Sequence, residues 1–177
     1  MTVPTRILLV SGSLRGGSVN GAVLRTALDV APDDIAPVVF DGLGGLPHFN
    51  PDEDVDPLPP PVAELRAAID DAHAVLFCTP EYAGTMPGSF KNLLDWTVGG
   101  GEIYEKPVGW INAASPGRGA LAHESLRTVL TYTGSRIIEG AAVRITVVRS
   151  AIEPDGLVHD PEIRAQILDV LNALARS

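Results

Sequence analysis

Short, unbroken apolar runs alternate along the chain with stretches in which apolar residues recur every three or four positions. The clearest runs occupy residues 7–10 (ILLV) and 74–78 (AVLFC), and neither shows the apolar–polar alternation of a half-exposed strand. Runs of this kind are typical of strands buried on both faces, as in parallel sheets covered by helices on each side. The alternation therefore predicts an α/β fold built from βαβ units with right-handed crossovers.

The pattern predicts five strands and five helices. Strands are expected over 6–11, 36–40, 74–79 and 107–113 and within 136–148; helices are expected over 20–30, from 62 to 72, 90–97, near 120–133 and from 161 onward. Asn20 is the expected N-cap of the first helix, and Asp160-Pro161-Glu162 is a typical start for the last one. These elements form one three-layer, doubly wound domain over residues 1–177, with a five-stranded parallel sheet. Such sheets bind ligands beyond the carboxyl ends of their strands.

Composition excludes several classes of protein. The 177 residues carry 13 Lys and Arg against 22 Asp and Glu, a net charge of −9, which argues against a nucleic-acid-binding protein. No apolar run is long enough to cross a bilayer, and the first residues do not resemble a secretory signal. The single cysteine, Cys78, cannot form an internal disulfide, so a cytoplasmic location is expected.

The turn after the first strand, residues 11–20, has the composition of an anion site. Ser13 and Ser18 offer hydroxyls, Asn20 offers an amide and Arg15 a positive charge, directly before a helix whose first amides are free. Leu14 stands where a dinucleotide fingerprint needs its second glycine, and no lysine precedes Ser18 as a Walker loop requires. The turn therefore favours a terminal phosphate monoester; the alternative is a well-capped helix without a ligand.

The turns after the third and fourth strands are rich in small residues. Tyr82, beside Ala83 and Gly84, can present a ring edge and free backbone amides to a flat ligand. Phe90 and Trp96, a little further on, are expected in the core or in a subunit interface. The turn at residues 114–120 again brings small residues and an arginine to a helix start. Three such turns at one sheet edge predict a cofactor cradle with few ionisable groups.

The motifs in these turns resemble those of the NAD(P)H-dependent FMN reductases, which have a flavodoxin-like fold. Gly-Ser-x-Arg-x-x-Ser-x-Asn lies at 12–20, Pro-Glu-Tyr at 80–82, and Pro-Gly-x-(Leu/Phe)-Lys-Asn-x-x-Asp-Trp at 87–96. The Ser-x-Gly turn at 115–117 also looks like the third flavin loop of that family. The resemblance covers essentially the whole chain.

The resemblance implies the strand order 2-1-3-4-5, bound FMN, and NADPH or NADH as electron donor. It also implies a small-molecule electron acceptor (a quinone, an azo compound, a metal oxyanion or free flavin) and a homodimer or homotetramer. The first turn would hold the FMN phosphate and the second would lie along the flavin ring. The FMN-binding residues expected on this basis are Ser13, Arg15, Ser18, Val19, Asn20, Pro80, Glu81, Tyr82, Ala83, Gly84, Ser115 and Gly117.

Ala83 is a departure from the family, which usually has Asn after Pro-Glu-Tyr. The missing amide predicts FMN binding that is weaker by roughly 0.5–1.5 kcal/mol. Two other functions stay open at this point. One is a flavodoxin-type electron carrier without a nicotinamide site, which the small-residue loop at 83–88 disfavours. The other is a dinucleotide-binding dehydrogenase with Asp41 as its ribose-binding acid, which Leu14 disfavours.

The remaining candidates have simpler explanations. Cys78 lies near the end of a buried strand and is expected to be a small core residue, and the four histidines show no metal-ligand spacing. The acidic loop of Asp52, Glu53, Asp54 and Asp56 is expected to be solvated. Lys91 and Asp95 are four residues apart, so they form either a local ion pair or a pair across a subunit interface.

Overall fold

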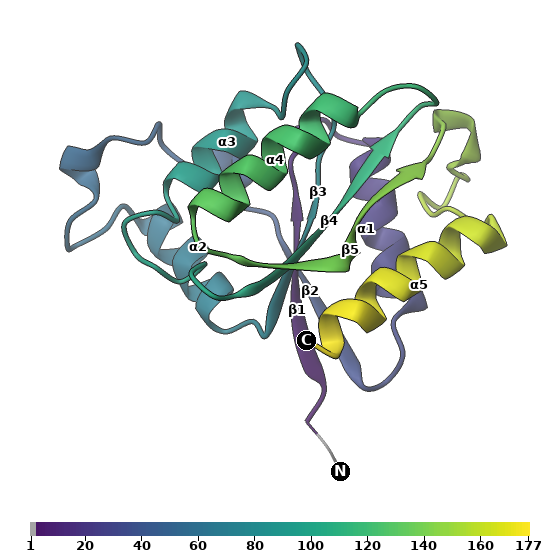
Figure 1. The fold of residues 1–177 in the computed structure, drawn as a ribbon, viewed down its shortest axis with the longest axis horizontal. Coiled ribbons are helices and arrows are strands. Elements are labelled where there is room, and N and C mark those ends of the chain that lie inside the picture. Colours follow the sequence, from purple (N-terminus) through teal and green to yellow (C-terminus); the bar gives the residue numbers. More distant parts are fainter. Residues whose placement is uncertain (1–2) are drawn as a thin grey trace.

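The computed structural model describes residues 3–177 and contains one parallel sheet with the strand order β2-β1-β3-β4-β5 (Figure 1). The flavodoxin-like order expected from the resemblance is therefore confirmed, as are all five strands. Residues 1 and 2 of the expected domain lie outside the described residues. The strands are β1 (Thr5–Ser11), β2 (Ile35–Phe40), β3 (Ala74–Cys78), β4 (Pro107–Ala114) and β5 (Arg136–Thr146).

Five α-helices cover the two faces of the sheet, as the pattern predicts. Figure 1 shows α1 and α5 on one side and α2, α3 and α4 on the other. Each side has its own apolar core, one centred on Ile7 and Leu9 of β1 and the other on Leu8 and Val10. The alternate residues of one strand thus serve opposite cores, which explains why the run at 7–10 has no polar position. The helices are α1 (Val19–Val30), α2 (Pro60–Asp70), α3 (Gly88–Asp95), α4 (Ala120–Tyr132) and α5 (Pro161–Ala175). None of the helices within residues 3–177 has the length and apolarity that crossing a membrane requires.

The start of α1 differs from the prediction, because Ser18 and not Asn20 is its N-cap. Ser18 has extended backbone angles, and its Oγ accepts a hydrogen bond from the Gly21 amide over 3.0 Å. Asn20 lies inside the first turn, where its side chain is buried. At the other end of the chain the prediction is confirmed: Asp160 caps α5 by accepting from the amides of Glu162 and Ile163.

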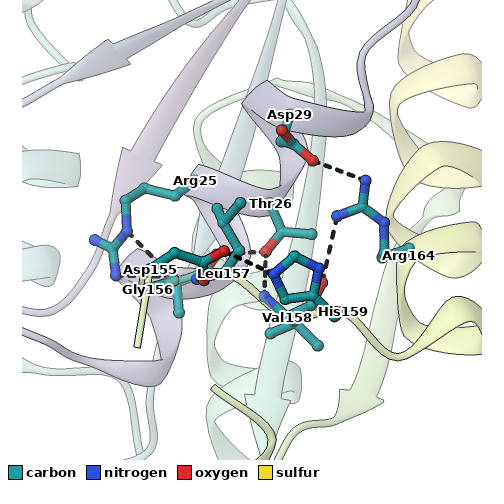
Figure 2. A network of polar contacts seen from close by, with 10 residues as sticks. Arg25, Thr26, Asp29, Asp155, Gly156, Leu157, Val158, His159 and Arg164 are labelled. Atoms are coloured by element: carbon teal, nitrogen blue, oxygen red, sulfur yellow. Dashed lines mark hydrogen bonds and ion pairs between the residues drawn. The ribbon is translucent and has the colours of Figure 1, made fainter. Parts of the chain in front are cut away.

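The segment between β5 and α5 is attached to α1 by a polar network (Figure 2). The Thr26 hydroxyl of α1 accepts from the Val158 amide over 3.0 Å, and the Arg25 guanidinium donates to the Gly156 carbonyl. Asp29 accepts from Arg164 of α5 over 2.7 Å. These contacts fix the path of the chain after β5, at the sheet edge where the strands end.

The acidic loop is not fully solvated as expected, because the half-buried Asp54 pairs with Arg66 of α2. The Arg66 Nη2 donates to Asp54 Oδ1 over 2.7 Å, and its Nε and Nη2 donate to the Trp96 carbonyl over 3.0 and 2.8 Å. Glu102 Oε2 lies 3.8 Å from Nε and has no hydrogen-bond partner among the described residues. A single buried guanidinium thus ties the long loop after β2, the end of α3 and the Gly-rich segment that follows it.

Trp96 and Phe90 are fully buried in the core, which is one of the two positions expected for them. The Trp96 indole donates to the Pro47 carbonyl over 2.8 Å and meets the Phe49 ring edge-on. Lys91 forms an ion pair with Asp95 within α3, which is the first of the two arrangements expected for these residues.

Replacing Arg66 by Met is expected to destabilise the protein by about 3–5 kcal/mol, since two largely buried carboxylates lose their counterion. For a chain of this size that loss lowers the melting temperature by roughly 6–20 °C, measurable by differential scanning calorimetry. The matched control is Arg164→Met, which breaks a more exposed pair worth about 1 kcal/mol or less. Equal effects of the two substitutions would contradict the role given to Arg66.

Candidate functional site

The turns after β1, β3 and β4 meet at one cavity of about 260 Å³ at the carboxyl edge of the sheet. Strand pairing explains the meeting, since Ser11 at the end of β1 lies beside Cys78 at the end of β3, and Cys78 lies beside Ile111 of β4. Eight of the predicted site residues line this cavity together with three residues that the sequence did not single out. The lining residues are Ser13, Arg15, Ser18, Val19, Asn20, Pro80, Tyr82, Ala113, Ser115, Val147 and Arg149.

The first turn is held open by its own hydrogen bonds. The Ser13 amide donates to Ser11 Oγ over 3.2 Å, and Ser13 Oγ accepts from the Arg15 amide over 3.3 Å. The Arg15 side chain is exposed and has no carboxylate within 4 Å among residues 3–177. The arrangement leaves a free cation beside the N-terminus of α1, where the helix dipole and backbone amides also favour an anion.

A hydrogen bond from the thiol of Cys78 orients the side chain of Asn20. The Cys78 Sγ donates to Asn20 Oδ1 over 3.3 Å, and both side chains are buried. Burial raises the pKa of the Cys78 thiol far above its ordinary value, so the group keeps the proton that it donates. Because the oxygen of the Asn20 amide is engaged by the thiol, its NH₂ group is the end left to donate toward the cavity. Cys78 is therefore a core residue, as predicted, and also a support for a site residue.

The second turn ends in a tight hairpin at residues 82–85. Tyr82 and Thr85 exchange backbone hydrogen bonds of 2.9 and 3.1 Å, and the two residues between them have positive φ angles, 50° at Ala83 and 75° at Gly84. Two successive positive φ angles are those of a type I′ turn, for which Asn-Gly is the preferred pair. The turn leaves the Tyr82 ring exposed at the rim of the cavity, whereas Ala83 and Gly84 are not among its lining residues.

Glu81 points away from the cavity and caps α4. Its Oε2 accepts from the Ala122 amide over 3.1 Å, while Gly119, the N-cap position, has no side chain to do so. A carboxylate at a helix N-terminus is stabilised by the helix dipole. Glu81 thus joins the second turn to the third, a role that the sequence pattern did not indicate.

The third turn lies between two cavities. Ser115 lines the central cavity and also a second one of similar volume, about 260 Å³, toward β5. Gly117, with a φ of 77°, lines only the second, next to Arg118 and to Arg144 of β5. The structure therefore brings Gly117 near the candidate site but not into its central part.

Ala113, Val147 and Arg149 are the lining residues that sequence reasoning missed. Ala113 and Val147 are buried near the ends of β4 and β5 and give the cavity an apolar side, and Arg149 follows β5 in a short 3₁₀ helix. The strand order was the available signal, because it places the end of β5 beside that of β4. Among residues 3–177 no group of three His, Cys, Asp or Glu side chains is placed to hold a metal ion.

Asp41, the candidate ribose-binding acid, lies at a different cavity. That cavity has a volume of about 380 Å³. It is lined by the first turn, by the end of β2 with the loop that follows it, and by Arg25 of α1. It shares Ser13, Arg15 and Ser18 with the central cavity, so the first turn forms the partition between the two.

The donor set of the central cavity fits FMN. One end offers hydroxyls, amides and the Arg15 cation for a phosphate, and the other offers Pro80, the Tyr82 ring and apolar strand ends for a flat ring system. Bound FMN supplies the redox chemistry, accepting electrons from a nicotinamide and passing them to a second substrate.

A comparison with known families decides the assignment. The model of a family described as NADPH-dependent FMN reductase matches residues 5–147. The chain belongs to this family. It is a flavin-dependent oxidoreductase with FMN as cofactor and a nicotinamide nucleotide as electron donor, which confirms the enzyme class and cofactors predicted from the motifs.

Individual relatives agree with the family. The chain is 33% identical to an NAD(P)H-dependent FMN reductase of Pseudomonas aeruginosa, over 98% of this chain and 95% of the relative. It is 30% identical to a 2-hydroxy-1,4-benzoquinone reductase of Burkholderia sp, over 96% and 94%. Among solved structures, the flavoenzyme NAD(P)H:(acceptor) oxidoreductase FerB of Paracoccus denitrificans superposes with a TM-score of 0.85 at 28% identity, covering 97% of this chain and 96% of that one.

Replacing Ala83 by Asn is expected to stabilise the protein by about 0.5–1 kcal/mol, because Asn adopts a positive φ at lower cost than Ala. The melting temperature rises by roughly 1–4 °C, and FMN binds more tightly because the turn gains an amide at its tip. Thermal denaturation and quenching of flavin fluorescence measure the two effects. Ala83→Val is the control and lowers stability, since a β-branched residue is strained at this φ. Weaker FMN binding by the Asn variant would contradict this geometry.

Proposed function

We propose that this enzyme transfers electrons from NADPH or NADH, by way of FMN bound in the central cavity, to a quinone. The observation that carries the proposal is the meeting of all three predicted turns at one cavity, with an anion-binding end and an apolar end. The relatives named 2-hydroxy-1,4-benzoquinone reductase and, in rice, probable NADPH:quinone oxidoreductase favour a quinone as the acceptor. The small residues at the tip of the second turn leave space for a planar acceptor beside the flavin.

The proposal gives each turn a task. Ser13, Arg15, Ser18, the Val19 amide and Asn20 hold the phosphate; Pro80, Tyr82 and Ser115 contact the flavin ring. Ala83, Gly84 and Gly117 do not line the central cavity, and the proposal places them beside the outer edge of the ring. Glu81 acts by holding the second turn against α4. No protein acid or base is assigned to the reaction, since the ionisable side chains at the cavity are arginines and Tyr82. The protein's contribution is position, a shielded apolar surface and positive charge.

A homodimer or homotetramer in the cytoplasm completes the proposal. Leu121 and Tyr132 of α4 and the rings of Tyr82 and Tyr104 are large apolar groups left exposed in the single chain, as at a face that meets another subunit. Lys91 and Asp95 take no part in this proposal, because their pair is local to α3 and half-exposed. The free thiol of Cys78 is compatible with a reducing compartment.

The proposed reaction is tested with purified protein loaded with FMN. Under anaerobic conditions NADPH or NADH is expected to bleach the visible absorbance of the bound flavin, and adding a benzoquinone is expected to restore it with formation of the hydroquinone. Turnover is then followed by nicotinamide absorbance with a quinone, an azo dye and free FMN as competing acceptors. Bleaching without reoxidation by quinone would overturn the assigned acceptor, and flavin that no nicotinamide reduces would overturn the donor.

Replacing Arg15 by Ala tests the phosphate end of the site. The substitution is expected to weaken FMN binding by about 1.5–3 kcal/mol, because a charged hydrogen bond to the phosphate is lost. Riboflavin, which has no phosphate, is expected to bind equally to both proteins in the same fluorescence titration. Arg136→Ala, which removes an exposed arginine at the far end of β5, is the charge-matched control and leaves both affinities unchanged. Equal losses for the two flavins would remove Arg15 from the phosphate site.

A further inference from the structure

Two arginines line the cavity beside the third turn. Arg118 follows the turn at the end of β4, and Arg144 lies on β5, the edge strand next to it. Neither guanidinium has a carboxylate within 4 Å or a hydrogen-bond partner in the part of the chain that the structure describes. Three of the eleven arginines, Arg66, Arg127 and Arg164, have carboxylate partners among residues 3–177, and Arg118 and Arg144 are among the eight that do not. Two unpaired cations on one small cavity of a protein with a net charge of −9 indicate a place for an anion.

The surroundings of these arginines offer further polar groups. Ser115 and Thr146 place hydroxyls at the cavity, and Asn112 of β4 also lines it. The Asn112 Nδ2 donates to the Thr79 carbonyl over 3.2 Å, but its Oδ1 is buried without a partner among the described residues. The turn leaves Asn112 this space, because a Cβ atom on Gly119 would lie 1.9 Å from Oδ1. A lining that combines cations and hydroxyls suits a ligand with both phosphate and hydroxyl groups.

The position of the cavity indicates which phosphate it would take. It shares Ser115 with the central cavity, and Arg149 faces the central cavity from the same side, just beyond β5. The proposed function assigns the FMN phosphate to Arg15 and the N-terminus of α1, which line the central cavity and not the cavity of Arg118 and Arg144. Arg118 and Arg144 lie outside the central cavity and are not needed for the FMN phosphate, and a quinone brings no phosphate. The nicotinamide dinucleotide is the reactant that carries additional phosphates and ribose hydroxyls to the flavin.

We propose that Arg118 and Arg144 bind a phosphate of the nicotinamide dinucleotide in the cavity between the third turn and the end of β5. This inference rests on the proposed function, since it assumes that FMN occupies the neighbouring central cavity. A guanidinium group can donate two parallel hydrogen bonds to two oxygens of one phosphate. Two such groups at one cavity can therefore hold either the pyrophosphate or the 2′-phosphate of NADPH. The second case makes these residues the determinants of the preference for NADPH over NADH.

The test measures dinucleotide binding independently of turnover. NADP⁺ and NAD⁺, which do not reduce the flavin, are titrated by calorimetry into FMN-loaded wild type, Arg118→Ala and Arg144→Ala. Each substitution is expected to weaken NADP⁺ binding about tenfold or more, while FMN affinity, measured by fluorescence quenching, changes less than about twofold. Arg144→Lys, which keeps the charge but not the paired donors, is expected to recover part of the loss. Arg136→Ala, which removes the same charge from the opposite end of β5, is expected to bind both nucleotides as the wild type does.

The two phosphate sources give different results. Weaker binding of NADP⁺ alone assigns the cavity to the 2′-phosphate, and parallel weakening of NADP⁺ and NAD⁺ assigns it to the pyrophosphate. Unchanged binding of both nucleotides in the Ala variants overturns the proposal, as does a loss of FMN affinity that parallels the loss of NADP⁺ affinity. The proposed function is tested separately by bleaching of the wild-type flavin with NADPH, so its failure is distinct from failure of this inference. Because both arginines are exposed, the variants keep the wild-type melting temperature.

Discussion

The parallel pairing of β1, β3 and β4 is the constraint on which the whole site depends. Each strand runs in the same direction, so each must be followed by a turn at one edge and a helix that returns the chain to the other edge. The register places Ser11, Cys78 and Ile111 side by side, which brings three turns that are distant in sequence within reach of one ligand. The two apolar cores stabilise this arrangement, and the free backbone amides and small side chains at the edge are available for binding.

The fold was predictable because its signals are local and repeated. The strand at 7–10 is apolar at every position since both of its faces are buried, and Asp160-Pro161 marks a helix start through its own side chain and ring. The errors lie where the outcome depends on a distant contact. Ser18 and Asn20 are both good capping residues. The side-chain oxygen of Asn20 accepts a hydrogen bond from Cys78, 58 residues away, so Ser18 is the residue that caps the helix. Asp54 looked solvated beside other acids, but it pairs with Arg66 of the following helix.

The candidate site shows the same division. Ser13, Arg15 and Ser18 were found because motif and turn coincide within ten residues of sequence. Arg149 and Val147 were missed because they follow a strand without a motif, and only the strand order places them at the cavity. The type of a residue also does not show where its side chain points. Glu81 lies in the Pro-Glu-Tyr motif, but its carboxylate accepts a hydrogen bond from the start of α4.

The contact of Glu81 with the Ala122 amide links two turns that would otherwise be separate loops. Because one carboxylate belongs to the second turn and stabilises the helix that begins after the third, opening of the second turn removes a stabilising contact from the start of α4. Thermodynamic linkage then requires reciprocity: a molecule that orders the turn at 80–82 increases affinity for a molecule held at 115–119, and the second increases affinity for the first by the same factor. Coupling of this kind needs no domain movement, since the hydrogen bond from the Ala122 amide to Glu81 joins the two turns directly.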